Sequence, residues 1–173
     1  MERPVDLSVD GPLRFRIDLS YDGTNFYGWA KQLGLRTVQS ELVEALNTIF
    51  GDSDDDFGMR VAGRTDAGVH AEGQVVHIDL SKEQFKRLGR NTDVEGRLNK
   101  LLTKGDIWIK SFEQAPAGFD ARFSAINRSY VYKVADKGSP KSPQIVRFAL
   151  YHLRRLDEKK MHEASQVLLG LHD

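Results

Sequence analysis

The sequence predicts an α+β fold with two domains, because two kinds of hydrophobic pattern alternate along it. Short runs in which apolar and polar residues alternate, as in half-buried strands, are separated by stretches with the apolar stripe of an amphipathic helix. Over residues 13–117 the predicted order is β-α-β-β-α-β, the split βαβ, ferredoxin-like arrangement that RNA-recognition motifs also use. A chain of 173 residues, 40% of them hydrophobic, is long enough to bury a core in such a fold.

The elements of the first domain follow a flexible N-terminal lead at residues 1–12. Residues 13–21 alternate so that four apolar side chains share one face of a strand. Thr37 can cap a helix whose apolar stripe extends from Val38 to Ile49, and Gly51 can end it. The remaining elements expected are strands at 59–62, 74–80 and 106–112, and a helical region at 83–102 broken near 89–91.

A second unit is predicted over residues 118–173. Residues 129–135 and 146–151 have the pattern of strands, and Asp157 can cap a helix that follows them. One helix and two strands cannot cover both faces of a sheet, so we expect this unit to be incomplete.

Composition and charge exclude several classes of protein. The chain has no cysteine, which excludes disulfides and thiolate catalysis, and it has neither a signal peptide nor an apolar run that could cross a membrane. A cytoplasmic protein is expected. Twenty-five basic residues balance 25 acidic ones overall, but residues 121–173 hold ten basic and five acidic residues. This basic second part weakly indicates a nucleic-acid partner, with ordinary charge scatter as the alternative.

The glycine-rich segment 63–73 is the strongest candidate site. Arg64 and Asp66 lie two residues apart and would share a face in extended backbone, where the cation would favour an ionised aspartate able to act as a nucleophile. The alternative is that Asp66 caps a turn and pairs with Arg64 at the surface. His70 can serve as a general base or phosphate contact, or as a structural histidine. The glycine spacing matches no nucleotide-binding loop, and the histidines lack the spacing of a zinc site.

A second group of candidate residues surrounds the predicted strand 129–135. Tyr130 and Tyr132 alternate on it, and an aromatic ring on an open sheet face can stack on a base. Arg122 and Arg128 precede it and are candidate phosphate contacts. The alternative for the tyrosines is a cross-strand aromatic pair in a core.

Six stretches, taken in order, resemble the tRNA pseudouridine synthase A (TruA) family. They are Tyr21-Asp22-Gly23-Thr24 with Phe26 and Gly28-Trp29; Arg36-Thr37-Val38-Gln39; Gly63 to His70, which reads GRTDAGVH; Phe119 to Ala125; Arg128-Ser129-Tyr130-Val131-Tyr132; and Leu168 to Asp173. The resemblance extends from about residue 14 to the end of the chain.

The resemblance implies a pseudouridine synthase fold and an isomerase that converts uridine to pseudouridine in the anticodon arm of tRNA. It implies Asp66 as the nucleophile, Arg64 as a partner of that aspartate, and Tyr130 against the uracil ring. No cofactor, no metal and a homodimer are expected from it. Family members continue for roughly another hundred residues, so the second domain is expected to be cut short here.

Three hypotheses follow from the sequence. The first is a tRNA pseudouridine synthase, and the second is a catalytically incompetent RNA-binding fragment that keeps the nucleophile but lacks a completed cleft. The third is a ferredoxin-like interaction domain with no role on RNA, for which the six ordered stretches leave little room.

Overall fold

The chain forms two compact units, Met1–Arg128 and Ser129–Asp173. The structure is a computed structural model that describes residues 5–88, 92–140 and 142–171. The predicted boundary lay between residues 117 and 118, whereas the structure places residues 118–128 with the first unit. None of the described helices is long and apolar enough to cross a membrane.

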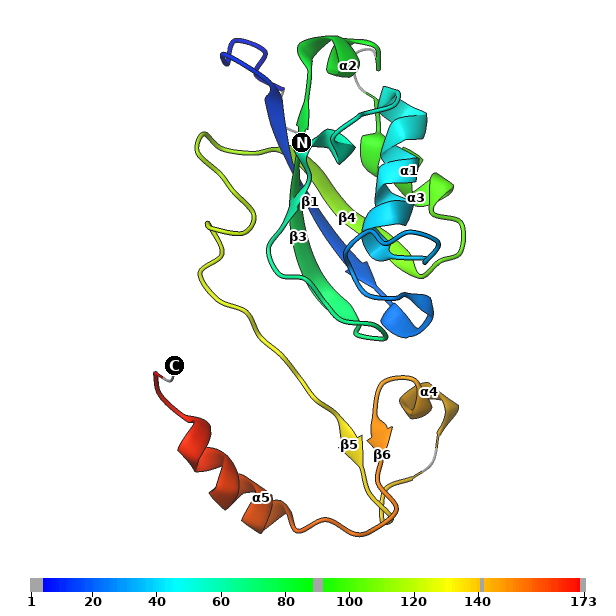
Figure 1. Cartoon of the computed structure of the whole chain (residues 1–173), viewed down its shortest axis with the longest axis vertical. Coiled ribbons are helices and arrows are strands. Elements are labelled where there is room, and N and C mark those ends of the chain that lie inside the picture. The colour runs from blue at the N-terminus through cyan, green and yellow to red at the C-terminus, as the bar shows by residue number, and fades with distance from the viewer. Residues whose placement is uncertain (1–4, 89–91, 141, 172–173) are drawn as a thin grey trace. The chain divides into compact units, whose positions relative to one another are not determined.

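An antiparallel four-stranded sheet forms the centre of the first unit, in the order β2-β3-β1-β4 (Figure 1). The two long inner strands pair along most of their length, with Ile17 opposite Val76. The mixture of sheet and helix is the α+β class that the sequence predicts. The strands are β1 (Leu13–Tyr21), β2 (Arg60–Val61), β3 (Ala71–Leu80) and β4 (Ile107–Gln114).

Helices α1 (Val38–Phe50) and α3 (Val94–Leu101) lie on the same face of this sheet, and α2 (Lys82–Lys86) follows β3 (Figure 1). The α1 bounds are those predicted. The Thr37 side chain accepts from the Ser40 N–H, the Ser40 hydroxyl accepts from the Thr37 N–H, and Gly51 ends the helix with a φ of 87°. The predicted helix break at 89–91 lies outside the described residues.

The core of the first unit lies between the sheet and these helices. β1 alternates strictly between buried and half-buried residues, so its apolar side faces the helices and its polar side faces away. Aromatic rings close the core at one end, where Phe15 stacks on Phe112 with ring centroids 4.8 Å apart. The fully buried members include Leu13, Phe15, Ile17, Leu19, Leu42, Leu46, Ile78, Leu80 and Leu98.

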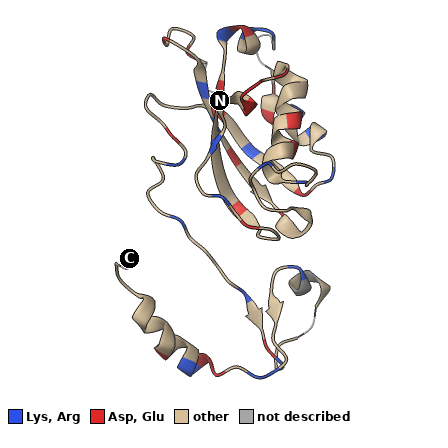
Figure 2. Ribbon diagram, viewed as in Figure 1, with Lys and Arg blue, Asp and Glu red and all other residues tan. Residues whose placement is uncertain are grey.

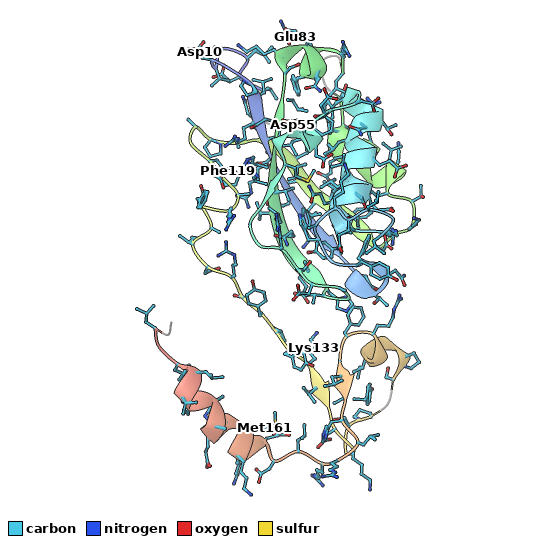
Figure 3. All side chains as sticks on the ribbon, in the orientation of Figure 1. Asp10, Asp55, Glu83, Phe119, Lys133 and Met161 are labelled. Carbon is cyan, nitrogen blue, oxygen red and sulfur yellow. The ribbon has the colours of Figure 1, made fainter. Side chains whose placement is uncertain are left out.

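The opposite face of the sheet is polar and is covered in part by residues 115–128. The Phe119 carbonyl accepts a hydrogen bond from Arg14 (2.8 Å), and the Ala121 N–H donates to His77 Nδ1 (2.9 Å). Figure 3 shows Phe119 beside the central strands, and its ring meets that of His77 edge to face. His77 is 1% exposed, so this strand histidine packs inside the first unit.

We expect His77 to make the first unit less stable as the pH falls below 6.5. Burial, followed by the charge of Arg14, holds the pKa of His77 below its ordinary value of 6.5. The folded state therefore keeps the imidazole neutral while the unfolded chain takes up a proton, so stability is lost between pH 6.5 and the lower folded pKa. The loss reaches at most about 1.4 kcal/mol per pH unit.

The measurement is urea unfolding at several pH values, followed by tryptophan fluorescence. Both tryptophans, Trp29 and Trp108, belong to the first unit and report on it alone. His77→Asn keeps an acceptor for the Ala121 N–H but cannot titrate, so it should flatten the dependence between pH 6.5 and 5. His162→Asn, in the other unit, should keep the wild-type slope. An unchanged slope in His77→Asn would contradict the assignment.

The second unit contains much less regular structure than predicted. β5 (Val134–Ala135) pairs in parallel with β6 (Leu150–Tyr151), so the strands predicted at 129–135 and 146–151 are correct only over their last two residues. No strand pairs with residues 129–132 in the described part of the chain, and a strand needs a partner for its backbone N–H and C=O groups. Helices α4 (Pro143–Val146) and α5 (Glu158–Ser165) and a 3-10 turn at Gln166–Leu168 complete the unit. Asp157 caps α5, as predicted.

Candidate active site

The glycine-rich segment predicted to carry the chemistry is the loop that joins β2 to β3. The Ala62 N–H donates to the Val75 carbonyl (2.8 Å), which extends the strand pairing by one residue before the chain leaves the sheet. Residues 63–70 then form the loop, and Ala71 begins β3. Asp66 therefore lies on a loop whose two ends are anchored in the same antiparallel strand pair.

Backbone hydrogen bonds fix this loop on both sides of Asp66. The Trp29 N–H donates to the Thr65 carbonyl (2.9 Å), and the Gly68 N–H donates to the Phe26 carbonyl (3.1 Å). Both partners belong to residues 22–29, which directly follow β1. The first of the six sequence stretches thus forms the platform on which the Asp66 loop rests.

Two glycines of this platform allow the close approach. A Cβ added to Gly23 would lie 2.0 Å from the Val69 carbonyl oxygen, and one added to Gly28 would lie 2.8 Å from the Thr65 carbonyl oxygen. Gly28 also has a φ of +87°, which side chains rarely adopt. Contact with the loop therefore requires glycine at both positions.

Side-chain hydrogen bonds hold the loop from beneath. The Tyr21 hydroxyl lies 2.7 Å from the Thr65 hydroxyl and accepts from Gln74 Nε2 (3.2 Å), which also donates to the Gly63 carbonyl (2.8 Å). Tyr21 and Gln74 are both buried. Burial raises the pKa of Tyr21 above its ordinary value, and the hydrogen bonds to Thr65 and Gln74 oppose that rise. The phenol is therefore a protonated structural group at neutral pH.

The Asp66 side chain itself is exposed, as is that of Arg64. The Val69 N–H donates to the Asp66 carbonyl (3.2 Å), and Gly68 has a φ of 77°, so the chain turns at this point. Within the described residues no hydrogen bond or ion pair engages either side chain, and the two are not brought together.

His70 closes the far end of the loop against the platform. The Gly23 N–H donates to His70 Nδ1 (3.1 Å), which lies equally close to a carboxylate oxygen of Asp22 (3.1 Å). A neutral Nδ1 accepts from Gly23, whereas a protonated Nδ1 would donate to Asp22. In both protonation states His70 ties the loop to residues 22–23, which supports the structural alternative for this residue.

The other candidate residues lie outside the loop. Arg128 donates through Nη2 and Nε to the Ala62 carbonyl (2.6 and 3.2 Å), just before the loop begins. The Arg122 guanidinium lies 5.6 Å from the centre of the Phe123 ring. Tyr130 belongs to the second unit, where its side chain is exposed. Figure 2 shows basic and acidic residues interspersed along both units.

The amino-acid sequence is similar to those of several curated proteins. No protein-family model matches it. It is 47% identical over 169 residues to tRNA pseudouridine synthase A of Streptomyces avermitilis, an alignment that covers 94% of this chain and 56% of that protein. The same-named protein of Leifsonia xyli subsp. xyli is 45% identical over 176 residues, with 95% and 61% covered. That of Mycobacterium leprae is 40% identical over 182 residues, with 100% and 61% covered.

The chain is similar to these tRNA pseudouridine synthase A proteins over nearly all of its own length. The resemblance seen in the six sequence stretches is thereby confirmed. The chain spans about three fifths of the length of the curated relatives it matches.

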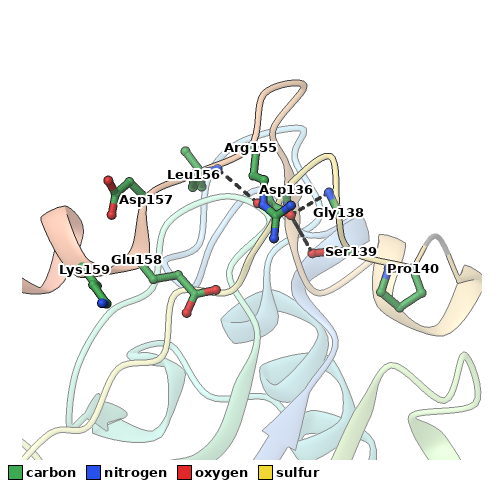
Figure 4. A pocket seen from close by; sticks show the side chains of 9 residues that line it. All are labelled: Asp136, Gly138, Ser139, Pro140, Arg155, Leu156, Asp157, Glu158 and Lys159. Carbon is green, nitrogen blue, oxygen red and sulfur yellow. Dashed lines mark hydrogen bonds between the residues drawn. The ribbon is translucent and has the colours of Figure 1, made fainter.

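A hollow of about 850 Å³ lies in the second unit. Residues from 136 to 140 and from 155 to 159 line it (Figure 4). The Asp136 carboxylate is occupied there, since it accepts from the Gly138 and Leu156 N–H groups (2.8 and 3.1 Å). None of the predicted site residues lines this hollow, so the loop at Asp66 remains the candidate.

The sequence reasoning missed the supports of the loop. Sequence patterns place Tyr21 and Gln74 on strands and include Tyr21 and Trp29 in the family resemblance, but they assign none of the three a role in supporting the loop. An available signal was polarity: Gln74 is an amide at a buried strand position, and a buried amide requires partners. Their partners lie up to 53 residues away, which no local pattern reveals.

Proposed function

We propose that the chain is a tRNA pseudouridine synthase in which Asp66 is the nucleophile and uridines of the anticodon arm are the substrate. The observation that carries this proposal is the state of Asp66. Its backbone is held on both sides by the Trp29–Thr65 and Gly68–Phe26 hydrogen bonds, while its carboxylate is exposed and engaged by no described residue. A nucleophile needs this combination of a fixed position and an unoccupied reacting atom.

The proposed reaction is an isomerisation that consumes no second substrate. The N1–C1′ glycosidic bond of uridine breaks, C5 of the uracil bonds to C1′, and the C5 hydrogen leaves to water while N1 gains a proton. The uridine must leave the stack to reach an aspartate on a protein surface. An exposed carboxylate can attack either C6 of the uracil or C1′ of the ribose.

The same proposal gives roles to the other candidate residues. Arg64, exposed two residues from Asp66, would contact the nucleotide, and Tyr130 would lie against the uracil ring. Arg122, Arg128 and His70 are proposed as RNA contacts, although His70 and Arg128 already hold the loop region in place. Homodimer formation, a cytoplasmic location and activity without a cofactor are part of the same proposal.

We also propose a ferredoxin-like arrangement for the first unit. The sheet order β2-β3-β1-β4 with antiparallel neighbours supports it, because a split βαβ unit places β3 between β1 and β2 and places β1 between β3 and β4. The position of α1 and α3 on one face supports it as well.

The proposal predicts that this chain releases tritium from tRNA labelled at uracil C5. Asp66→Asn keeps the size and fold of the loop but is a far poorer nucleophile, so it should lower the release more than about a thousandfold. The assay counts label in water after removal of the tRNA.

Asp54→Asn is the matched control, since Asp54 is also exposed on a loop and should keep wild-type release. Release that survives in Asp66→Asn would refute Asp66 as the nucleophile. If the wild-type chain binds tRNA but releases no label, the chain is an RNA-binding fragment and the enzymatic proposal fails.

A further inference from the structure

A chain of hydrogen bonds beneath the Asp66 loop has one consistent direction. Gln74 Oε1 accepts from the Val75 N–H (3.2 Å), so its Nε2 is the donor to the Gly63 carbonyl and to the Tyr21 hydroxyl. Both amide atoms are therefore satisfied in a single orientation. Because an amide NH₂ cannot accept, the Tyr21 hydrogen must go to another group.

That group is Thr65. Tyr21 is 5% exposed, and its hydroxyl has two partners among the described residues, the Gln74 amide and the Thr65 hydroxyl at 2.7 Å. A buried hydroxyl that donates nowhere is costly, so Tyr21 donates to Thr65 Oγ1. The series from Gln74 through Tyr21 to Thr65 thus fixes the residue that directly precedes Asp66.

The same residues also secure the start of the loop. The Gln74 side chain donates a hydrogen bond to the Gly63 carbonyl, and the Trp29 backbone N–H donates one to the Thr65 carbonyl. Gly63 and Thr65 flank Arg64, whose side chain is exposed. Tyr21 and Gln74 approach the loop with side chains that β1 and β3 keep rigid, since each is a buried strand residue.

We infer that Tyr21 and Gln74 are positioning residues of the active site, acting through Thr65 and Gly63 to set the orientation of Asp66. Neither touches the reacting atoms. The inference rests on the proposed function for its meaning in catalysis, but the positioning itself is a property of the folded chain.

Amide hydrogen exchange tests the positioning without reference to activity. Tyr21→Phe removes only the hydroxyl, so the loop should detach more often, and the Trp29 and Gly68 amides should exchange about tenfold faster. Amides of the β1–β3 pairing around Ile17 and Val76 should change less than about twofold. Tyr27→Phe is the matched control, because Tyr27 is exposed and its hydroxyl has no partner among the described residues.

Variants of Thr65 test whether Tyr21 acts on the loop through the Thr65 hydroxyl. Thr65→Ser keeps an acceptor for Tyr21 and should exchange as the wild type does, whereas Thr65→Val should reproduce Tyr21→Phe. The double variant Tyr21→Phe/Thr65→Val should be no worse than Thr65→Val alone. In the tritium assay Tyr21→Phe should lower kcat about tenfold and leave KM within twofold.

The outcomes separate this inference from the proposed function. If Trp29 exchange in Tyr21→Phe equals that in Tyr27→Phe, the inference is wrong. Faster exchange throughout β1–β3 would also overturn it, since that result means general destabilisation. If no variant and no wild-type chain releases tritium, the proposed function fails, while the exchange rates still decide whether Tyr21 positions the loop.

Discussion

Replacing Gly23 by alanine is expected to lower the free energy of unfolding of the first unit by about 3 kcal/mol. The added Cβ would lie 2.0 Å from the Val69 carbonyl oxygen and 2.4 Å from its carbon, both backbone atoms that cannot rotate away. The loop must therefore move off its platform. That movement stretches the bond from the Gly23 N–H to His70 and the bonds on either side of Asp66.

Urea unfolding followed by tryptophan fluorescence measures this loss. Trp29 is 2% exposed and its N–H holds the loop, so its emission reports on the affected region. Gly73→Ala is the matched control, because the space around Gly73 is open and its φ is not left-handed. It should change the free energy of unfolding by less than about 0.5 kcal/mol. Equal midpoints for the two variants would show that the loop accommodates the methyl group.

Local patterns predicted the parts of the fold that local physics determines. The bounds of β1 and α1 follow from strict alternation in one case and from the Thr37 cap and Gly51 in the other. Residues 129–133 place Tyr130 and Tyr132 on one face as a strand would, yet they form no strand. A strand requires a partner, and the described part of the second unit pairs only Val134–Ala135 with Leu150–Tyr151. Alternation indicates how a strand would be buried, not whether a neighbour is present.

The sequence predicted the loop that carries Asp66, but not the residues that hold this loop in place. Residues 63–70 were found from glycine spacing and family resemblance, and the structure places them on one loop. The Tyr21–Thr65 and Gln74–Tyr21 bonds join residues 44 and 53 positions apart, so they depend on the register of β1 against β3. Register comes from the packing of the whole sheet, which a one-dimensional pattern does not contain.

Arg36 joins the same platform to the rest of the first unit. Its guanidinium donates to Asp106 (2.6 and 3.0 Å) and to Glu41 (2.9 and 3.0 Å), and it lies 4.2 Å from the centre of the Phe26 ring. The Arg36 carbonyl accepts from the Tyr27 N–H (2.9 Å). The Arg36 side chain therefore connects the start of α1, the start of β4 and Phe26, whose carbonyl accepts the hydrogen bond from the Gly68 N–H.

We expect Arg36→Met to lower the free energy of unfolding of the first unit by about 2–3 kcal/mol at pH 7. Removing one partner of a buried ion pair typically costs about 3–5 kcal/mol. The cost is smaller here because the Arg36 and Asp106 side chains are 21% and 16% exposed and Lys104 remains 3.4 Å from Glu41. Arg16→Met is the control, because its pair with Asp18 is 43% exposed on the arginine side and should be worth about 1 kcal/mol or less.

The pH dependence of this loss identifies its cause. Hydrogen bonds from Arg36 hold the pKa of Glu41 below its ordinary value of 4.5. A carboxylate with a lowered folded pKa stabilises the fold above pH 4.5, and that contribution disappears as the pH falls through the folded pKa. The difference between wild type and Arg36→Met in urea unfolding should therefore be largest near pH 7 and shrink below pH 4.5. A difference that stays constant down to pH 3 would mean that Arg36 acts by packing on Phe26, and that the ion pairs contribute little.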